Sequence, residues 1–397
     1  KGTPILSKIP ETPEEKIDLF LKLFRCREDI YPHRWENRKT GKSGYSPVCG
    51  NEWKKGICEK PELKCSACRY CSYLPLDSEA VRLHLEGKEI IGTYAIREDD
   101  TTTFLAADFD GAAWQDDVLL FKQAANEFGI DAVIEISRSG KGAHSWIFFD
   151  VTVAASLARR LGTVIMTRAL SQSGCFSLDS YDRFFPNQDF LPSGGFGNLI
   201  ALPLQYESRK NGKTIFVDDK LKPYENQWEY LCKVKRLSLD IIVRILDDIS
   251  SLKEQLELSD SEDMDVNLAE RDIDPLADEI NEKAYEGVVD IELAAMLSID
   301  ANTIPARLLS ALRRIATFAN PKFFEMQRMR FSTWNIPRYI CSAEYDGKTI
   351  KLPRGTLDAC NELIEQGGAS VKINDIRSLP ETVNFIFKGV LREDQRK

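Results

Sequence analysis

The chain has 397 residues and a formal net charge of −9, with 43% hydrophobic and 29% charged residues. This composition is that of a globular protein and excludes disorder along the whole length, while the length leaves room for two or three domains. No run of about 18 apolar residues occurs, and residues 1–13 lack the basic-then-apolar order of a signal peptide. We therefore expect a cytoplasmic protein with no membrane contact.

The charge is unevenly divided along the chain. Residues 20–70 hold twelve Lys or Arg against six Asp or Glu, whereas residues 254–292 hold fifteen acids and two bases. Proteins that bind phosphates concentrate their cations locally, so the acidic total does not exclude a nucleic-acid partner for the basic N-terminal region.

The N-terminal region combines one predicted helix with a cysteine-rich stretch. Residues 14–27 have the apolar spacing of an amphipathic helix, and residues 31–73 lose all periodicity. The spacing Cys49-x8-Cys58-x6-Cys65-x2-Cys68 suits a tetrahedral, structural Zn²⁺ site, which would supply the core that this stretch lacks. Cys71 could replace Cys68 as a ligand, and buried free thiols or an iron–sulfur cluster are the alternatives. Nearby aromatic and basic residues suit stacking on bases or, equally, packing around the zinc: Tyr31, Arg34, Trp35, Lys42, Tyr45 and Trp53.

The central region, about residues 91–235, alternates between extended and helical patterns. The order strand, helix, strand, strand, helix, strand over residues 103–178 predicts a ferredoxin-like core of the kind also used by RNA-recognition folds. The fold class is therefore α+β. The predicted strands are residues 92–96, 103–109, 132–137, 144–149, 175–178 and 198–204, and the predicted helices are residues 114–128 and 154–170.

The C-terminal part is predicted to be mainly helical. A helix over residues 237–256 leads into an acidic linker at residues 259–274, and residues 278–330 again have a helical pattern. Residues 337–352 predict a hairpin with Asp346-Gly347 at its turn. These patterns divide the chain into four parts: residues 1–90, 91–235, 236–335 and 336–397.

Asp108 and Asp110 end an apolar strand-like run two residues apart. Side chains at positions i and i+2 of a strand point the same way, so both carboxylates would converge at the strand end. Two such charges repel unless a cation joins them, and Mg²⁺ or Mn²⁺ prefers carboxylate oxygens. The pair therefore suits two-metal phosphoryl transfer, although a solvated turn or a lone ion site would have the same pattern.

A small-residue turn follows one strand later. In Ser137-Arg-Ser-Gly-Lys-Gly-Ala-His144 the backbone N–H groups could approach phosphate, while Arg138 and Lys141 add positive charge. A plain hairpin with a structural histidine is the alternative, but His144 begins an apolar strand and so needs a polar partner. Further along, Asp182 or Asp179 could complete a three-carboxylate metal site.

Three features, namely the Asp108–Asp110 pair, the small-residue turn ending in His144 and the later aspartate, together resemble the pattern of the archaeo-eukaryotic primase superfamily. Four longer strings are more specific and resemble the primases of transposon-encoded TOTE conflict systems. CRISPR-associated primase-polymerases are similar. The resemblance covers about residues 90–235 and extends to the cysteine region. The strings are residues 44–53, 106–111, 181–189 and 194–205.

The resemblance implies specific roles. Asp108 and Asp110 would bind the catalytic Mg²⁺ or Mn²⁺ ions, while Ser139, Lys141 and His144 would hold the incoming NTP or dNTP. The third metal ligand would be Asp182 by similarity to end-joining polymerases, or Asp179 by the superfamily's plainer pattern. Arg209 matches a basic position that could touch phosphates.

The resemblance also predicts the activity. We expect a template-dependent primase-polymerase acting on single-stranded DNA. Residues 385–395 resemble the approach to a superfamily-2 helicase, which predicts a helicase domain in the full-length protein. An idle nucleic-acid-binding module and a nuclease are the alternatives. Intact Asp108, Asp110 and His144 oppose the first, and the triphosphate turn opposes the second.

Overall fold

The computed structural model describes residues 8–37, 39–60, 62–63, 65–172, 180–256, 287–331, 336, 339–346, 348–377 and 388–389. Two compact units divide the chain. The first comprises Lys1–Glu279 with Thr317–Cys341, and the second comprises Ile280–Ala316 with Ser342–Lys397. Among the described residues, no helix is both long enough and apolar enough to cross a bilayer.

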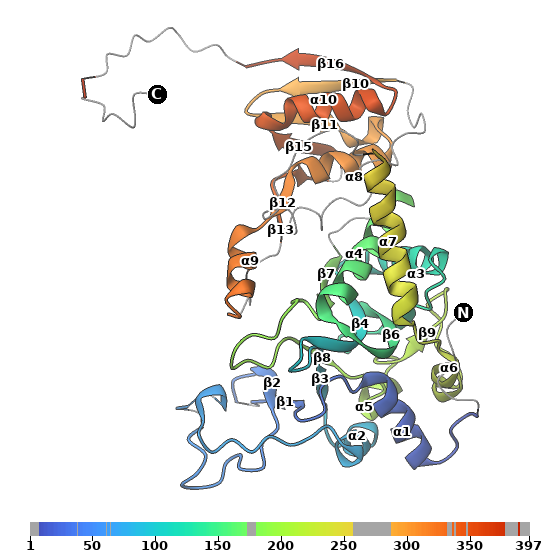
Figure 1. The fold of residues 1–397 in the computed structure, drawn as a ribbon, viewed down its shortest axis with the longest axis vertical. Helices are drawn as coiled ribbons and strands as arrows, with labels where there is room; N and C mark the ends of the chain where they lie inside the picture. Colours follow the sequence, from blue (N-terminus) through green and yellow to red (C-terminus); the bar gives the residue numbers. More distant parts are fainter. Residues whose placement is uncertain are drawn as a thin grey trace. The chain divides into compact units, whose positions relative to one another are not determined.

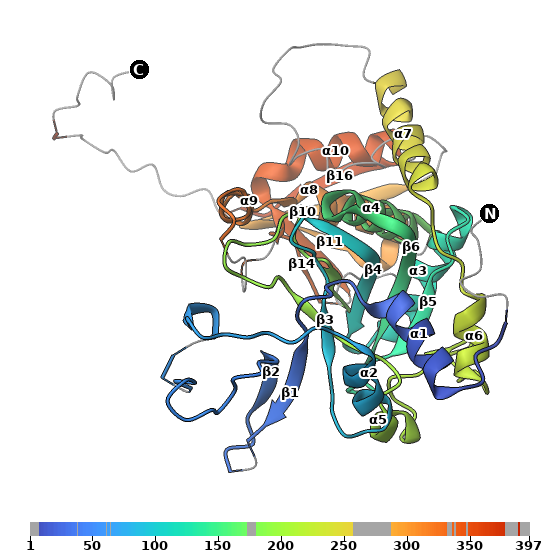
Figure 2. The same cartoon turned by 60° about the horizontal axis from the view of Figure 1, so that its bottom comes forward.

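The first unit is built around a five-stranded antiparallel sheet of order β7-β4-β6-β5-β9, of which Figure 1 labels β7, β4, β6 and β9 and Figure 2 labels β5. Its element order is strand, helix, strand, strand, helix, strand, as predicted, although the last strand begins at Tyr181 and the predicted strand at 175–178 lies outside the described residues. The strands are β4 (Thr101–Asp110), β5 (Val133–Ile136), β6 (Gly142–Ala154), β7 (Tyr181–Phe185) and β9 (Phe216–Val217).

Alternating side chains give this sheet two apolar faces. On β4, Leu105, Ala107 and Phe109 pack on the side of α3 (Trp114–Glu127), α4 (Ala155–Gln172) and α7 (Leu239–Leu256). Phe104 and Ala106 belong to a second core with the opposite set of helices. That set is α1 (Pro13–Phe24), α2 (Ser78–Leu85) and α6 (Gln227–Lys233). Both cores fix the register of β4, because a shift by one residue would exchange its two faces.

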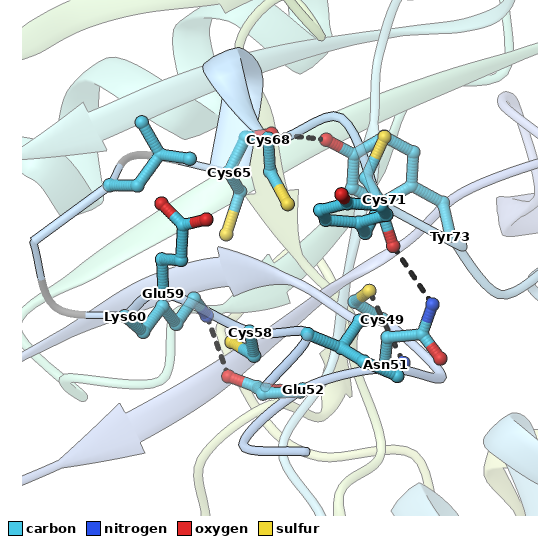
Figure 3. A pocket seen from close by; sticks show the side chains of 13 residues that line it. Cys49, Asn51, Glu52, Cys58, Glu59, Lys60, Cys65, Cys68, Cys71 and Tyr73 are labelled. Carbon is cyan, nitrogen blue, oxygen red and sulfur yellow. Dashed lines mark hydrogen bonds and ion pairs between the residues drawn. The ribbon is translucent and has the colours of Figure 1, made fainter. Parts of the chain in front are cut away.

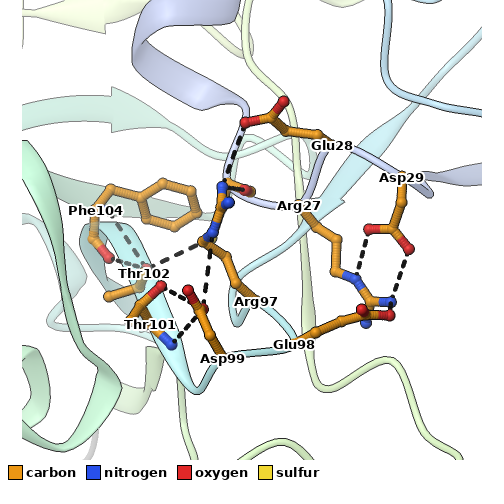
Figure 4. Close-up of polar contacts among 10 residues, drawn as sticks. Arg27, Glu28, Asp29, Arg97, Glu98, Asp99, Thr101, Thr102 and Phe104 are labelled. Atoms are coloured by element: carbon orange, nitrogen blue, oxygen red, sulfur yellow. Dashed lines mark hydrogen bonds and ion pairs between the residues drawn. The ribbon is translucent and has the colours of Figure 1, made fainter.

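The N-terminal helix α1 begins at a capping box. The Thr12 side chain accepts the Glu15 N–H, and the Glu15 carboxylate accepts the Thr12 N–H. After α1, residues 25–30 are tied to the turn before β4 (Figure 4). Arg27 makes two hydrogen bonds of 2.8 Å to Asp29 and one of 2.9 Å to Glu98. These contacts hold the N-terminal segment against the sheet.

Smaller elements surround the central sheet. The β1–β2 hairpin lies beside β3 (Figure 2), where His33 and Ile91 form a β-bridge. Strand β3 in turn pairs with β8. The bounds are β1 (Pro32–Glu36), β2 (Ser43–Pro47), β3 (Gly92–Tyr94), β8 (Leu199–Ala201), α5 (Tyr206–Lys210), β12 (Thr317–Ala319), α9 (Pro321–Arg328) and β13 (Tyr339–Cys341).

The second unit contains a five-stranded sheet, which corrects the prediction of a helical C-terminal region. The prediction over residues 278–330 is wrong for residues 288–300, where Val289, Ile291 and Leu293 alternate with exposed side chains at strand spacing. The sheet order is β14-β15-β11-β10-β16, and the β14–β15 hairpin confirms the one predicted around Asp346. The elements are β10 (Val288–Leu293), β11 (Met296–Asp300), α8 (Ala306–Ile315), β14 (Glu344–Tyr345), β15 (Thr349–Pro353), α10 (Leu357–Gln366) and β16 (Ser370–Asp375).

Candidate active site

Two carboxylates lie on one face at the end of β4. Because Leu105, Ala107 and Phe109 face α3 and α4, the alternate residues Asp108 and Asp110 face the other way, as the sequence predicts. The Asp108 side chain is 13% exposed, and Asp110 is exposed at the strand end. The strand thus carries one carboxylate into the protein and one to its surface.

His144 lies opposite Asp108 on the neighbouring strand β6. Its Nε2 is 3.6 Å from Oδ1 of Asp108, and its Nδ1 donates to Oε2 of Glu135 on β5 at 2.7 Å. The indole N–H of Trp146 donates to the same Glu135 oxygen at 3.2 Å. Glu135 is 1% exposed, so this buried carboxylate fixes the orientation of the imidazole and leaves Nε2 toward Asp108.

These charges shift two pKa values. Burial raises the pKa of Asp108 to about 6, with opposing effects from His144, which lowers it, and from Asp110 and Asp182, which raise it. Burial alone would lower the pKa of His144, but the Glu135 and Asp108 carboxylates outweigh it and raise this pKa to about 9. At neutral pH His144 is therefore a cation between two carboxylates.

A β-bulge places a third carboxylate, that of Asp182, in the neighbourhood of Asp108. In the pairing of β4 with β7, Asp108 lies opposite Arg183 and Phe109 lies opposite Tyr181, so Asp182 is the extra residue. Arg183 makes hydrogen bonds of 2.7 and 3.2 Å to the Asp182 carboxylate, which offsets its charge. Asp182 raises the pKa of Asp108, so the two carboxylates interact.

The turn between β5 and β6 lies at the same end of the sheet. The Ser137 and Ser139 hydroxyls are 2.9 Å apart, and Ser139 Oγ accepts the Lys141 N–H at 3.0 Å. Gly142 closes the turn opposite Asp110, where an added Cβ would overlap the Asp110 carboxylate. A glycine is required here, and it places the turn directly beside the carboxylates.

Two predicted residues are not part of this cluster as described. Asp179 lies outside the described residues. Arg209 is on α5, where its guanidinium lies over the Tyr206 ring at 5.1 Å. Burial lowers the pKa of Arg209, and its charge in turn contributes to the lowered pKa of His84.

The cysteine-rich stretch forms a pocket (Figure 3). Cys49, Cys58, Cys65, Cys68 and Cys71 all line it. The Cys49 sulfur accepts two backbone N–H groups, from Asn51 at 3.4 Å and from Ser72 at 3.3 Å. Cysteine sulfurs are among the ligands that Zn²⁺ prefers in structural sites. The donor set therefore fits Zn²⁺ by its chemistry.

Neither the cysteines nor the carboxylates form a closed ligand set. Throughout the part of the chain that the structure describes, no three His, Cys, Asp or Glu side chains are placed to surround one cation.

The aromatic residues of the cysteine region fall into two groups by exposure. Tyr31 is buried in the core, while Trp35 and Trp53 are 42% and 68% exposed.

Glu135 and Arg183 are site residues that the sequence patterns did not identify. A glutamate within the apolar run Val133–Ile136 was the available indication, because a buried carboxylate requires a partner. Arg183 gave no such indication, since its position opposite Asp108 depends on strand pairing.

Residues 15–245, more than half of the chain, match the family model of the archaeo-eukaryotic primase domain of the TOTE conflict system. This match and the site define a nucleotidyltransferase domain of the primase and polymerase class. The chain belongs to the family of TOTE conflict system archaeo-eukaryotic primases.

Among solved structures, the chain is similar to the polymerase domain of Mycobacterium tuberculosis Ligase D in complex with DNA. The identity is 14% and the TM-score 0.31, over 60% of this chain and 89% of that chain. No curated protein matches the chain.

Proposed function

We propose that this protein is a template-dependent primase-polymerase with a ferredoxin-like catalytic core, acting on single-stranded DNA with NTPs or dNTPs. One observation carries the proposal: Asp108 lies opposite His144, and the β5–β6 turn lies beside Asp110. These positions support the proposal, because carboxylates suit divalent cations and positively charged side chains at the turn suit a triphosphate.

In the proposed reaction a 3′-hydroxyl oxygen attacks the α-phosphorus of the incoming nucleotide. The new O–P bond forms as the bond from the α-phosphorus to the bridging oxygen breaks, the hydroxyl proton passes to water, and pyrophosphate leaves. Asp108, Asp110 and Asp182 would hold Mg²⁺ or Mn²⁺, which when bound would neutralise charge on the phosphates. Arg183 limits repulsion among the three carboxylates by pairing with Asp182.

The incoming triphosphate would lie along the turn. Ser137 and Ser139 offer hydroxyl donors, Arg138 and Lys141 offer positive charge, and His144 offers a charged imidazole held by Glu135. Arg209 is proposed as a more distant phosphate contact.

The N-terminal module would bind nucleic acid. A structural Zn²⁺ on Cys49, Cys58, Cys65 and Cys68, with Cys71 as the alternative to Cys68, would fix this stretch. Exposed Trp35 and Trp53 suit stacking on unpaired bases. A helicase domain in the full-length protein completes the proposal, and it is tested by sequencing the natural reading frame.

The test is synthesis of primers on single-stranded DNA with labelled NTPs and dNTPs, with Mg²⁺ or Mn²⁺ supplied in turn. Wild type should give product, and the Asp108→Asn/Asp110→Asn variant should give none while unfolding at the same temperature. Asp182→Asn and Asp179→Asn are compared in the same assay, and the true third ligand is the one whose loss abolishes product. The control is Asp116→Asn, an exposed carboxylate in the first turn of α3.

The same assay separates the alternatives. Binding of single-stranded DNA without synthesis or extension by wild type would favour a non-catalytic module. Shortening of the DNA without added nucleotide would favour a nuclease, for which the cationic turn has no evident use.

A further inference from the structure

Lys213 lies against the turn that joins β5 to β6. Thr214 N donates to Ile136 O at 2.8 Å, and Ile136 N donates to Ile215 O at 2.9 Å, so this segment continues beside the end of β5. A Cβ added to Gly140 would be 3.0 Å from Cε of Lys213. The aliphatic chain of Lys213 therefore crosses directly over the glycine of the turn.

The backbone on both sides of Lys213 is in the left-handed region. Gly212 has φ +69° and Thr214 has φ +55°, which is a rare conformation for a β-branched residue. Thr214 is 1% exposed, and within the described residues its hydroxyl has no hydrogen-bond partner. Strained residues of this kind cluster at active sites and ligand-binding segments, and here the backbone hydrogen bonds of Thr214 to Ile136 and Leu204 hold the strained segment in place.

A polar hollow of about 960 Å³ opens beside this segment, and its cations are Arg34, Lys88, Arg138 and Lys213. Arg34 and Lys88 form ion pairs with Glu36 and Glu86. Arg138 and Lys213, in contrast, have no carboxylate partner among the residues that the structure describes. Glu36, Glu89 and Glu207 also line the hollow, but in the described part of the chain none of them forms an ion pair with Arg138 or Lys213. These two cations come from separate loops and are available to an anionic ligand.

The order of groups along the sheet identifies which anion. From β4 through β6 to β5, the site passes from Asp108 to His144 and then to the turn with Lys213. Strands are spaced about 4.8 Å apart, and the Lys213 segment lies one strand beyond β5, so its backbone is roughly 14 Å from that of Asp108. The long Lys213 side chain shortens this separation, because it crosses over Gly140 in the β5–β6 turn. A nucleoside triphosphate with its α-phosphate at the carboxylates would extend its terminal phosphates toward Lys213.

We propose that Lys213, which lines the same hollow as Arg138, binds the β- and γ-phosphates of the incoming nucleotide and the pyrophosphate that leaves. This assignment rests on the proposed function and adds a phosphate contact from outside the β5–β6 turn. An ammonium group on a long side chain suits this role, because it can follow the phosphate as the bond to the α-phosphorus breaks.

The experiment compares Lys213→Met with Lys213→Arg and with the control Lys220→Met, an exposed lysine after β9. Methionine keeps an unbranched chain over Gly140 and removes only the charge. Binding of dATP and of dAMP in the presence of Mn²⁺ is measured by calorimetry, and binding of a single-stranded oligonucleotide by fluorescence anisotropy. Lys213→Met should weaken dATP binding about 10- to 100-fold, as expected for loss of a charged contact, and leave dAMP and oligonucleotide binding unchanged. Lys213→Arg should retain most of the dATP affinity.

Unchanged dATP affinity in Lys213→Met, with a wild-type melting temperature, would overturn the assignment. Loss of oligonucleotide affinity with unchanged dATP affinity would also overturn the assignment. It would indicate that the hollow binds a nucleic-acid strand. If Lys213→Met does not fold, Lys213→Gln is measured in its place with the same criteria. Failure of wild type to bind dATP or make product would instead refute the proposed function, so the two failures are distinguishable.

Discussion

Asp108 and His144 face each other across β4 and β6, with Nε2 of the imidazole 3.6 Å from Oδ1 of the carboxylate. On the opposite side of the ring, Nδ1 donates to Glu135 at 2.7 Å. The imidazole is thus shared between a buried carboxylate and one that is 13% exposed. Glu135 can only orient and charge the ring, whereas Asp108 is reachable by a ligand.

Replacing Glu135 should change the charge of His144. In Glu135→Gln the amide oxygen can still accept the Nδ1 proton, but the negative charge that raises the pKa of His144 is lost. We expect this pKa to fall from about 9 toward or below its ordinary value of about 6.5, and triphosphate affinity at neutral pH to fall about tenfold.

NMR titration measures this change directly, because the chain has only three histidines. The matched control is Glu127→Gln, an exposed glutamate on α3 that pairs with Arg168 at 2.8 Å. A His144 pKa that is the same in wild type and Glu135→Gln would show that Glu135 has no electrostatic role.

His84 should make the fold sensitive to acid. It is fully buried, its Nε2 donates to Pro203 O at 2.8 Å, and its Nδ1 accepts the Ile91 N–H. Burial lowers its pKa to about 4, so between pH 6.5 and 4 the unfolded chain binds a proton that the folded chain does not. Stability therefore falls as the pH drops through this window, by roughly 3 kcal/mol in total.

Urea unfolding at several pH values tests this. His84→Gln can keep both hydrogen bonds without a titrating group, so its free energy of unfolding should depend less on pH than that of wild type between pH 6.5 and 4. Equal pH dependence in the two proteins would contradict the prediction.

Gln327 on α9 should hold the loop that follows β7. Its amide donates to the Asp189 carboxylate at 2.7 Å and accepts the Asp189 N–H at 3.3 Å, while Arg159 binds the same carboxylate at 2.5 Å. Because Gln327 is 6% exposed, Gln327→Ala should cost about 1–3 kcal/mol of stability by removing its two hydrogen bonds to Asp189, while Arg159 still binds the Asp189 carboxylate.

Chemical denaturation gives this free energy. Glu325→Ala, an exposed residue of the same helix, is the control and should have little effect. If the free energy of unfolding fell no more in Gln327→Ala than in Glu325→Ala, α9 would not stabilise the loop.

Much of the central region was predictable because its patterns are local. The strand predicted at 103–109 is β4, and the shared face of Asp108 and Asp110 follows from alternation alone. The role of Glu135 was not predictable, because its contact with His144 depends on how β5 pairs with β6. Asp182 likewise reaches the site through a bulge, and bulges are set by pairing rather than by composition.

The C-terminal error has a different cause. Residues 288–300 alternate over two short strands, β10 and β11, and α8 with its helical spacing follows closely. A sequence window that covers all three elements mixes the strand period of 2 residues with the helix period of 3.6 residues. The helical period dominated the prediction for the whole window. The position of Lys213 was not predicted, because it depends on two residues in the left-handed region, Gly212 and Thr214. Glycine adopts this conformation readily, but threonine does so rarely, so the sequence indicates only the first of them.

The cysteine pocket gives the last prediction, which concerns zinc. The purified protein should contain about one zinc per chain, since four thiolates complete one tetrahedral site. Cys65→Ser should lose the metal because serine is a poor zinc ligand, and Cys71→Ser should retain it if Cys68 is the fourth ligand.

Elemental analysis by mass spectrometry measures the zinc content. Cys341→Ser, an exposed cysteine outside the pocket, is the control and should retain the wild-type content. If Cys68→Ser retained zinc and Cys71→Ser lost it, the fourth ligand would be Cys71 and not Cys68. If the wild-type protein contained iron and no zinc, an iron–sulfur cluster would be indicated in place of the zinc site. If it contained neither metal, these cysteines would be ordinary thiols. Loss of zinc should not unfold the core, because α1 and β4 pack on each other without any of these cysteines.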